Sequence, residues 1–242
     1  MRTLIALLLA AASLCAQQIP TGTLLPSMLD NTIDSDRSKP GEAISAKLRQ
    51  DVPLPDGGKI KRDSRILGHV VAVVPASAGH PARVSIQFDH IVVDKEQFAA
   101  QIGLRALASM EAVAAAREPV NANSGLGTSV WDWNMVQVGG QAVFNGQRIV
   151  KSQTGQVVGR VPEPGAVLAV PMANPQRGCA GASSDTAEQA FWIFSTDACG
   201  VYGYKDLTIS GAGNGAASAA IVLRSPKRIT VRDGSGLLLE VK

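Results

Sequence analysis

Trp131 and Trp133 are residues whose type and spacing suggest a binding function. On a β-strand a spacing of two places both indole rings on the same face. Exposed aromatic pairs of this kind can bind sugars or partner proteins by stacking. The alternative is a strand that packs both rings into the core. Trp131 and Trp133 are therefore candidate ligand-binding residues, with inward packing as the other interpretation.

Two further groups carry the atoms for acid–base or nucleophilic chemistry. Asp89 and His90 are adjacent in a segment with strand-like alternation. Neighbours on a strand point to opposite faces, so we expect these two side chains not to act on one substrate. Ser195 and Asp197 have no histidine near them in sequence to activate the serine, although the fold could supply one. Neither group predicts a catalytic site.

Other enzyme and metal motifs do not occur in the sequence. No G-x-S-x-G elbow is present, and residues 211–216 (GAGNGA) have the wrong glycine spacing for a dinucleotide fingerprint. Asp30, Asp34 and Asp36 could bind calcium, but the EF-hand spacing and its closing glutamate are missing, which favours solvated loop acids. We therefore expect a non-catalytic protein without a cofactor or a metal.

The composition is typical of a chain with many turns. Its 242 residues include 24 Gly and 13 Pro, and aromatic residues are only 4%, so Val, Ile, Leu and Ala must form the core. The net charge of +3 comes from Lys and Arg residues that are dispersed along the chain. No basic stripe with interleaved aromatic residues occurs, and we expect no nucleic-acid partner.

The N-terminus has the pattern of a secretory signal peptide. A positive start at Met1-Arg2 is followed by the apolar run Leu4–Leu14 and by Ala16. The run is shorter than the roughly 20 residues of a membrane-spanning helix, and an uncleaved anchor is the alternative. We expect a periplasmic or secreted protein with no stable membrane span after signal cleavage.

Cys179 and Cys199 would remain after cleavage, because Cys15 lies within the signal peptide. An even number of cysteines in an oxidising compartment predicts a disulfide. Closing this loop of about 20 residues would stabilise the fold by roughly 3 kcal/mol in the chain-entropy model. Two free buried thiols are the alternative. A metal site is disfavoured, because no histidine has ligand spacing with either cysteine.

Alternating apolar residues predict the strands that must position these groups. Period-two patterns occur in residues 42–52 and 83–93 and indicate half-buried strands. Residues 97–117 are rich in Ala and Leu, which favour a helix, yet their apolar positions alternate through Ser109. We expect a strand up to Ser109 and a short helical or irregular connector from Met110 to Arg117.

Three local features predict further details. Pro26 interrupts the first apolar segment and indicates an edge strand or a bend. The run Phe191–Phe194 is fully apolar and predicts a buried strand. Residues 228–241 contain two apolar runs around Asp233–Gly236 and predict a terminal hairpin.

The predicted fold class is all-β, with a β-barrel or sandwich-like N-terminal module and a second β-rich half. The expected boundaries are a signal peptide at 1–16, a β module at 19–110, a connector at 111–128 and a β-rich C-terminal region with the disulfide at 129–242.

A motif pattern in the first module is shared with a known family. It comprises Gly22-Thr23, Pro26, Leu29, Ile33-x-Ser35-Asp36, Pro40-Gly41, then Ser64, Leu67 and Gly68, and the strand VSIQFD at 84–89. These residues resemble the C-terminal β-barrel module of TrbI-like proteins, which belong to conjugation and type IV secretion channels. The Pro-Lys-Gly core of that family's motif is replaced here by other residues. The resemblance implies a barrel fold and a place in the cell envelope.

We expect a secreted or periplasmic, non-catalytic β-rich structural or binding protein of the cell envelope. One alternative is an accessory component of a conjugation or type IV secretion-like assembly, which would bind other envelope proteins through its strand edges. Another alternative is a carbohydrate-binding module or a cryptic hydrolase that uses Trp131, Trp133 and scattered aspartates.

Overall fold

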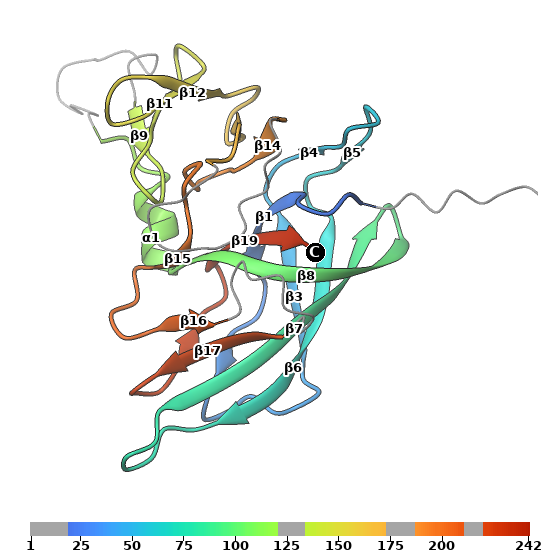
Figure 1. Ribbon diagram of the computed structural model, residues 1–242, viewed down its shortest axis with the longest axis vertical. Coiled ribbons are helices and arrows are strands. Elements are labelled where there is room, and N and C mark those ends of the chain that lie inside the picture. The colour runs from blue at the N-terminus through green and yellow to red at the C-terminus, as the bar shows by residue number, and fades with distance from the viewer. Residues whose placement is uncertain (1–18, 121–133, 173–186, 211–219) are drawn as a thin grey trace, which may run out of the picture.

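A computed structural model describes residues 19–120, 134–172, 187–210 and 220–242. The described parts are almost entirely β, with one short helix, α1 (Met110–Ala115). The predicted all-β fold class is confirmed. Figure 1 shows a barrel in the lower part of the molecule and a smaller sheet above it.

The larger sheet closes into a six-stranded barrel, because β8 pairs with both β19 and β7. Its strands, in spatial order, are β8 (Glu96–Ala108), β19 (Gly236–Val241), β1 (Leu24–Leu29), β3 (Ala43–Leu48), β6 (Arg65–Val74) and β7 (Ala82–Val93). Three strands extend this sheet: β15 (Gly200–Tyr202), β16 (Thr208–Ser210) and β17 (Ile221–Ser225). The barrel therefore combines segments from both ends of the described chain.

The period-two patterns produce the barrel core as predicted. On β3 the side chains of Ile44, Ala46 and Leu48 are buried, and β7 buries the alternating positions of the predicted strand 83–93. Each large apolar side chain removed from water in this way contributes about 1.5–3 kcal/mol. The core is aliphatic apart from Phe88, which is fully buried.

The ambiguous segment after residue 96 is a strand followed by a helix, as predicted. Strand β8 ends at Ala108, and the Ser109 hydroxyl caps helix α1 by accepting a hydrogen bond from the Ala112 amide. Pairing with β7 and β19 on both sides overrides the helical propensity of the alanines in β8. The cap then starts the helix at the first residue that has no strand partner on the barrel.

The prediction of an edge strand around Pro26 was wrong. Strand β1 lies between β19 and β3. The proline is tolerated there because the ladder with β3 covers only Ser27–Leu29. The Pro26 carbonyl still accepts a hydrogen bond from the Arg49 amide at 3.0 Å, so only the missing N–H had to be accommodated.

The predicted terminal hairpin was also wrong. Strand β18 (Thr230–Val231) pairs with β2 (Ile33–Asp34), whereas β19 inserts between β1 and β8. Every residue of β19 is buried. A strand of that kind needs partners on both sides, which a two-stranded hairpin could not provide.

The smaller sheet is an antiparallel meander of short strands above the barrel (Figure 1). In spatial order it contains β14 (Gln189–Ala190), β13 (Leu168–Ala169), β12 (Val157–Arg160), β11 (Ile149–Lys151), β10 (Ala142–Phe144) and β9 (Asn134–Val136). A separate two-stranded ladder joins β4 (Val52–Pro53) to β5 (Lys59–Ile60).

Residues Phe191–Phe194 are buried as predicted but do not form a strand. Trp192 adopts a left-handed backbone with φ of 50°, and Phe194 makes only an isolated bridge to Val138. The segment turns within a second apolar cluster that lies between the smaller sheet and the barrel. Tertiary packing on several sides, rather than strand pairing, therefore buries these residues.

Two buried polar side chains join the barrel to the segments around the smaller sheet. Gln50, just after β3, donates to the Val167 carbonyl at 2.9 Å and accepts from the amides of Val167 at 3.0 Å and Trp192 at 2.6 Å. Arg105 on β8 donates to the carbonyls of Ala198 at 3.2 Å and Thr196 at 3.4 Å. Burial lowers the pKa of Arg105, and the nearby Glu240 opposes that shift. The Gln50 bonds hold Val167 and Trp192 to the barrel, and the Arg105 bonds hold the turn 195–198 there.

Candidate ligand-binding cleft

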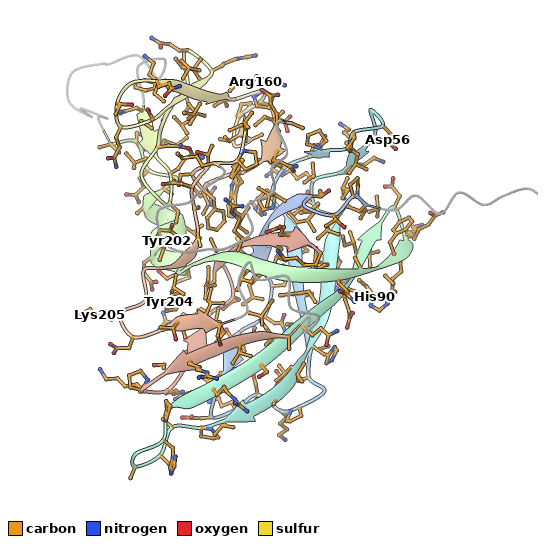
Figure 2. All side chains as sticks on the ribbon, viewed as in Figure 1. Asp56, His90, Arg160, Tyr202, Tyr204 and Lys205 are labelled. Carbon is orange, nitrogen blue, oxygen red and sulfur yellow. The ribbon has the colours of Figure 1, made fainter. Side chains whose placement is uncertain are left out.

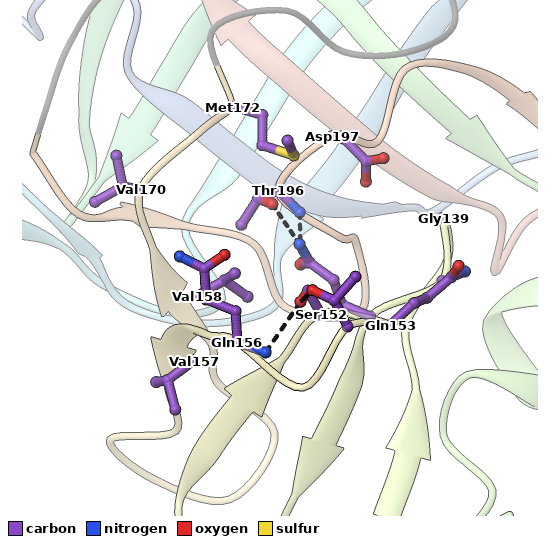
Figure 3. Close-up of a pocket in the computed structure, with 13 residues that line it drawn as sticks. Gly139, Ser152, Gln153, Gln156, Val157, Val158, Val170, Met172, Thr196 and Asp197 are labelled. Atoms are coloured by element: carbon purple, nitrogen blue, oxygen red, sulfur yellow. Dashed lines mark hydrogen bonds between the residues drawn. The ribbon is translucent and has the colours of Figure 1, made fainter.

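A cleft with a volume of about 630 Å³ opens at one end of the smaller sheet. In an antiparallel meander every second turn lies at the same end. The turn between β9 and β10, the turn between β11 and β12, and the chain leaving β13 therefore converge, and residues 196–197 complete the wall (Figure 3). The cleft is built from turns, which rigid strands hold in place.

The first wall depends on two adjacent glycines. Gly139 and Gly140 have φ values of 106° and 108°, which side-chain-bearing residues rarely adopt. A Cβ on Gly139 would lie 2.0 Å from the Ser195 hydroxyl oxygen. The close approach lets Val138 exchange backbone hydrogen bonds with residues 193 and 195. The turn between β9 and β10 is thereby fixed to the segment that leads into residues 196–197.

Neutral amide and hydroxyl groups form the floor between these walls. Gln141 accepts from the Thr196 amide at 2.9 Å and donates to the Thr196 hydroxyl at 2.5 Å. The Ser195 hydroxyl donates to Asp197 at 2.6 Å. Asp197 is the one ionisable side chain among the described residues that line the cleft.

The opposite wall is the turn from Ser152 to Gln156. The Ser152 hydroxyl accepts from the Gln156 amide at 3.2 Å and lies 2.9 Å from the Thr154 hydroxyl. The side chains of Gln153, Thr154 and Gln156 are exposed and line the cleft. Figure 3 shows Gln153 and Gln156 on this turn. Their amides and hydroxyls can both donate and accept hydrogen bonds.

An apolar strip runs beside the polar groups. Val157, Val170 and Met172 line the cleft and remain 56%, 42% and 44% exposed. These large apolar side chains are exposed to solvent and lie next to neutral hydrogen-bonding groups. Such a combination fits a ligand that has both C–H and O–H surface.

Some of the residues singled out from sequence cannot be placed. Trp131, Trp133 and Cys179 lie outside the described residues, so the stacking pair and the disulfide stay predictions. Cys199 is buried at 1% exposure, and its amide donates to the Tyr202 hydroxyl at 3.0 Å. Asp197 lines the cleft, whereas Ser195 is fully buried and does not line it.

The expectation that Asp89 and His90 point apart was wrong. The Asp89 carboxylate lies 2.5 Å from His90 Nδ1 and 3.0 Å from His69 Nδ1. A β-bulge causes this, because the ladder with β6 passes directly from Phe88 to His90 and leaves Asp89 without a partner. Figure 2 places His90 on the barrel, away from the smaller sheet that carries Arg160.

The acidic residues near the N-terminal strands are not simply solvated. Asp34 is buried and accepts hydrogen bonds from Arg228 Nε at 3.1 Å and Nη2 at 2.6 Å. Burial alone would raise the pKa of Asp34, but hydrogen bonds from Arg228, the Asp36 amide and Thr230 together lower it. Within the described ranges, no group of three or more His, Cys, Asp or Glu residues could hold a metal ion.

Comparison with known proteins gives no relative: no family model matches the chain, and no curated protein matches it. In the part of the chain that the structure describes, no helix is long and apolar enough to cross a membrane.

The cleft residues Gln141, Gln153 and Gln156 were not predicted from the sequence. Isolated glutamines carry no motif, and only the pairing of the meander brings them together. The sequence feature that could have located the cleft is the regular spacing of turn residues. Among these, Gly139-Gly140 and Thr154-Gly155 mark one end of the sheet.

Proposed function

We propose that this protein is a non-catalytic binding protein of the cell envelope, secreted or periplasmic, whose cleft binds a neutral oligosaccharide. The observation that carries the proposal is the lining of neutral amide and hydroxyl side chains around about 630 Å³. Groups that both donate and accept match sugar hydroxyls, which do the same. The strip of Val157, Val170 and Met172 would contact the C–H face of a sugar ring.

The surroundings of Ser195 support binding rather than hydrolysis. Its hydroxyl donates to Asp197 and is fully buried, so it lacks the accessible, base-activated geometry of a nucleophile. The three histidines of the chain lie on β6, on β7 and in the turn between them. None of them lines the cleft.

A glycan array followed by titration calorimetry tests the proposal. We expect the protein to bind a neutral oligosaccharide, and Gln156→Leu to weaken that binding at least tenfold by removing an exposed donor and acceptor. Gln101→Leu is the matched control, since Gln101 is exposed on β8 outside the cleft, and it should bind like the wild type. Absence of binding to any glycan, or equal binding by Gln156→Leu, would refute the proposal.

The envelope location also rests on the signal-peptide pattern at residues 1–16 and on the resemblance of residues 22–89 to TrbI-like barrels. We propose that Cys179 and Cys199 form a disulfide in the exported protein. Mass analysis without reductant should then find the chain two hydrogens lighter than the fully reduced form. Two free thiols in the exported protein would contradict this prediction.

A further inference from the structure

A second cavity, of about 210 Å³, lies on another side of the smaller sheet, next to the end of α1. Its lining is mostly apolar and includes Met135, Val143, Val161, Val167 and Ile193. At roughly 30 Å³ per water molecule the space equals about seven waters, the size of a small organic molecule. It shares none of its lining residues with the neutral cleft.

Two arginines bring positive charge to the neighbourhood of this cavity. Arg117 lines it, and the guanidinium of Arg49 lies 5.6 Å from the ring centre of Trp192, another lining residue. Among the described residues, neither arginine has a carboxylate within 4 Å. Burial is the main cause that lowers the pKa of Arg49; the nearby Arg62 and Arg117 add to it, and Asp63 and Asp30 oppose it.

One buried polar atom in the cavity lining, and another on Arg49 beside Trp192, have unused hydrogen-bonding capacity within the described structure. Gln137 lines the cavity and is 4% exposed; its Nε2 donates to the Phe194 carbonyl at 2.6 Å, but its Oε1 accepts nothing. The Nε of Arg49 is likewise buried without an acceptor. Leaving such a group unpaired costs about 1–3 kcal/mol, which a ligand with complementary groups would recover.

We propose that this cavity binds a small apolar carboxylate that also carries an N–H group, as an N-acyl derivative of an apolar amino acid does. The apolar side chain fills the space between Val143 and Val167. The carboxylate lies at Arg117, where charge-assisted hydrogen bonds are strongest, and Arg49 beside Trp192 adds positive charge. The N–H group donates to Gln137 Oε1 after a small side-chain adjustment. The site is independent of the oligosaccharide cleft.

Titration of the full mature protein with N-acetyl-L-leucine, followed by NMR chemical shifts, tests this site. We expect saturable binding, and at least tenfold weaker binding of N-acetyl-L-leucinamide, which has the same shape without the charge. 4-Methylpentanoate, which keeps the carboxylate but lacks the N–H group, should also bind more weakly. Equal binding of the acid and the amide, or no binding of the acid, would overturn the proposal.

Arginine variants locate the binding. Arg117→Gln should weaken N-acetyl-L-leucine binding at least tenfold, and because Arg117 is exposed the fold should persist, as a circular dichroism spectrum would show. Arg83→Gln makes the same change at an exposed position of β7 outside the cavity and should bind like the wild type. Loss of binding in Arg83→Gln, or wild-type affinity in Arg117→Gln, would contradict the assignment.

Discussion

Gly68→Ala should destabilise the barrel by about 3 kcal/mol or more, as expected when extra volume is forced into a closely packed site. A Cβ at this position would lie 2.1 Å from the Gln87 carbonyl oxygen and 2.9 Å from the Phe88 Cα. Both contacts are with the backbone of β7, which cannot rotate away as a side chain could. The neighbouring strands must separate where the ladder skips Asp89, so the contacts of Asp89 with both histidines should be lost too.

Urea unfolding followed by circular dichroism measures this change. Gly79→Ala, in the turn of the same β6–β7 hairpin, is the control: its φ is 78°, but nothing lies within 4 Å of the added Cβ. Gly79→Ala should lower the free energy of unfolding only by the backbone strain of a positive φ, about 1–2 kcal/mol. If Gly68→Ala were no more destabilising than Gly79→Ala, the close approach of β6 to β7 would be wrong.

Gln50→Leu should lower the free energy of unfolding by about 3–5 kcal/mol, although leucine and glutamine side chains are similar in size. The change leaves the Val167 amide and carbonyl and the Trp192 amide without their partner, and each unpaired buried group costs about 1–3 kcal/mol. Val167 and Trp192 are only 4% and 6% exposed, so water does not readily replace the lost bonds. The segments around the smaller sheet should loosen from the barrel before the barrel itself unfolds.

Hydrogen exchange distinguishes this local effect from general destabilisation. The amides of Val167 and Trp192 should exchange much faster in Gln50→Leu, while those of β3 keep most of their protection. Gln101→Leu removes an exposed amide instead and should change the unfolding free energy by less than about 0.5 kcal/mol. Unchanged exchange at Val167 and Trp192 would show that Gln50 does not hold this segment.

The barrel strands could be predicted because their side chains follow the pleat. In β3, and in β7 up to Phe88, one face is buried, so the period of two is visible in the residues themselves. The same rule failed at Asp89, since a bulge adds one residue and changes the face. The bulge lies opposite Gly68, which is more than twenty positions away in sequence, and no local pattern could reveal that pairing.

The cleft, and the buried hydrogen bonds of Gln50 and Arg105, could not be predicted from the sequence for a related reason. Gln50 meets Val167 and Arg105 meets Thr196 across long stretches of chain, and a single buried glutamine or arginine resembles a surface residue in sequence. The hairpin predicted at residues 228–241 shows the same limit. Its turn residues are suitable, but the partners of β19 are β1 and β8, which lie far from it in sequence.

The position of β19 bears on the order of events during folding. Leu24 pairs with Glu240, so β1 gains this partner only after β19, the last of the six barrel strands along the chain, has been made. Long-range pairing of this kind slows folding. Until β19 docks, β1 and β8 each expose an unpaired strand edge. Chaperones and neighbouring chains bind surfaces of this kind. The nascent protein therefore has an association-prone period that ends abruptly when β19 completes the ring.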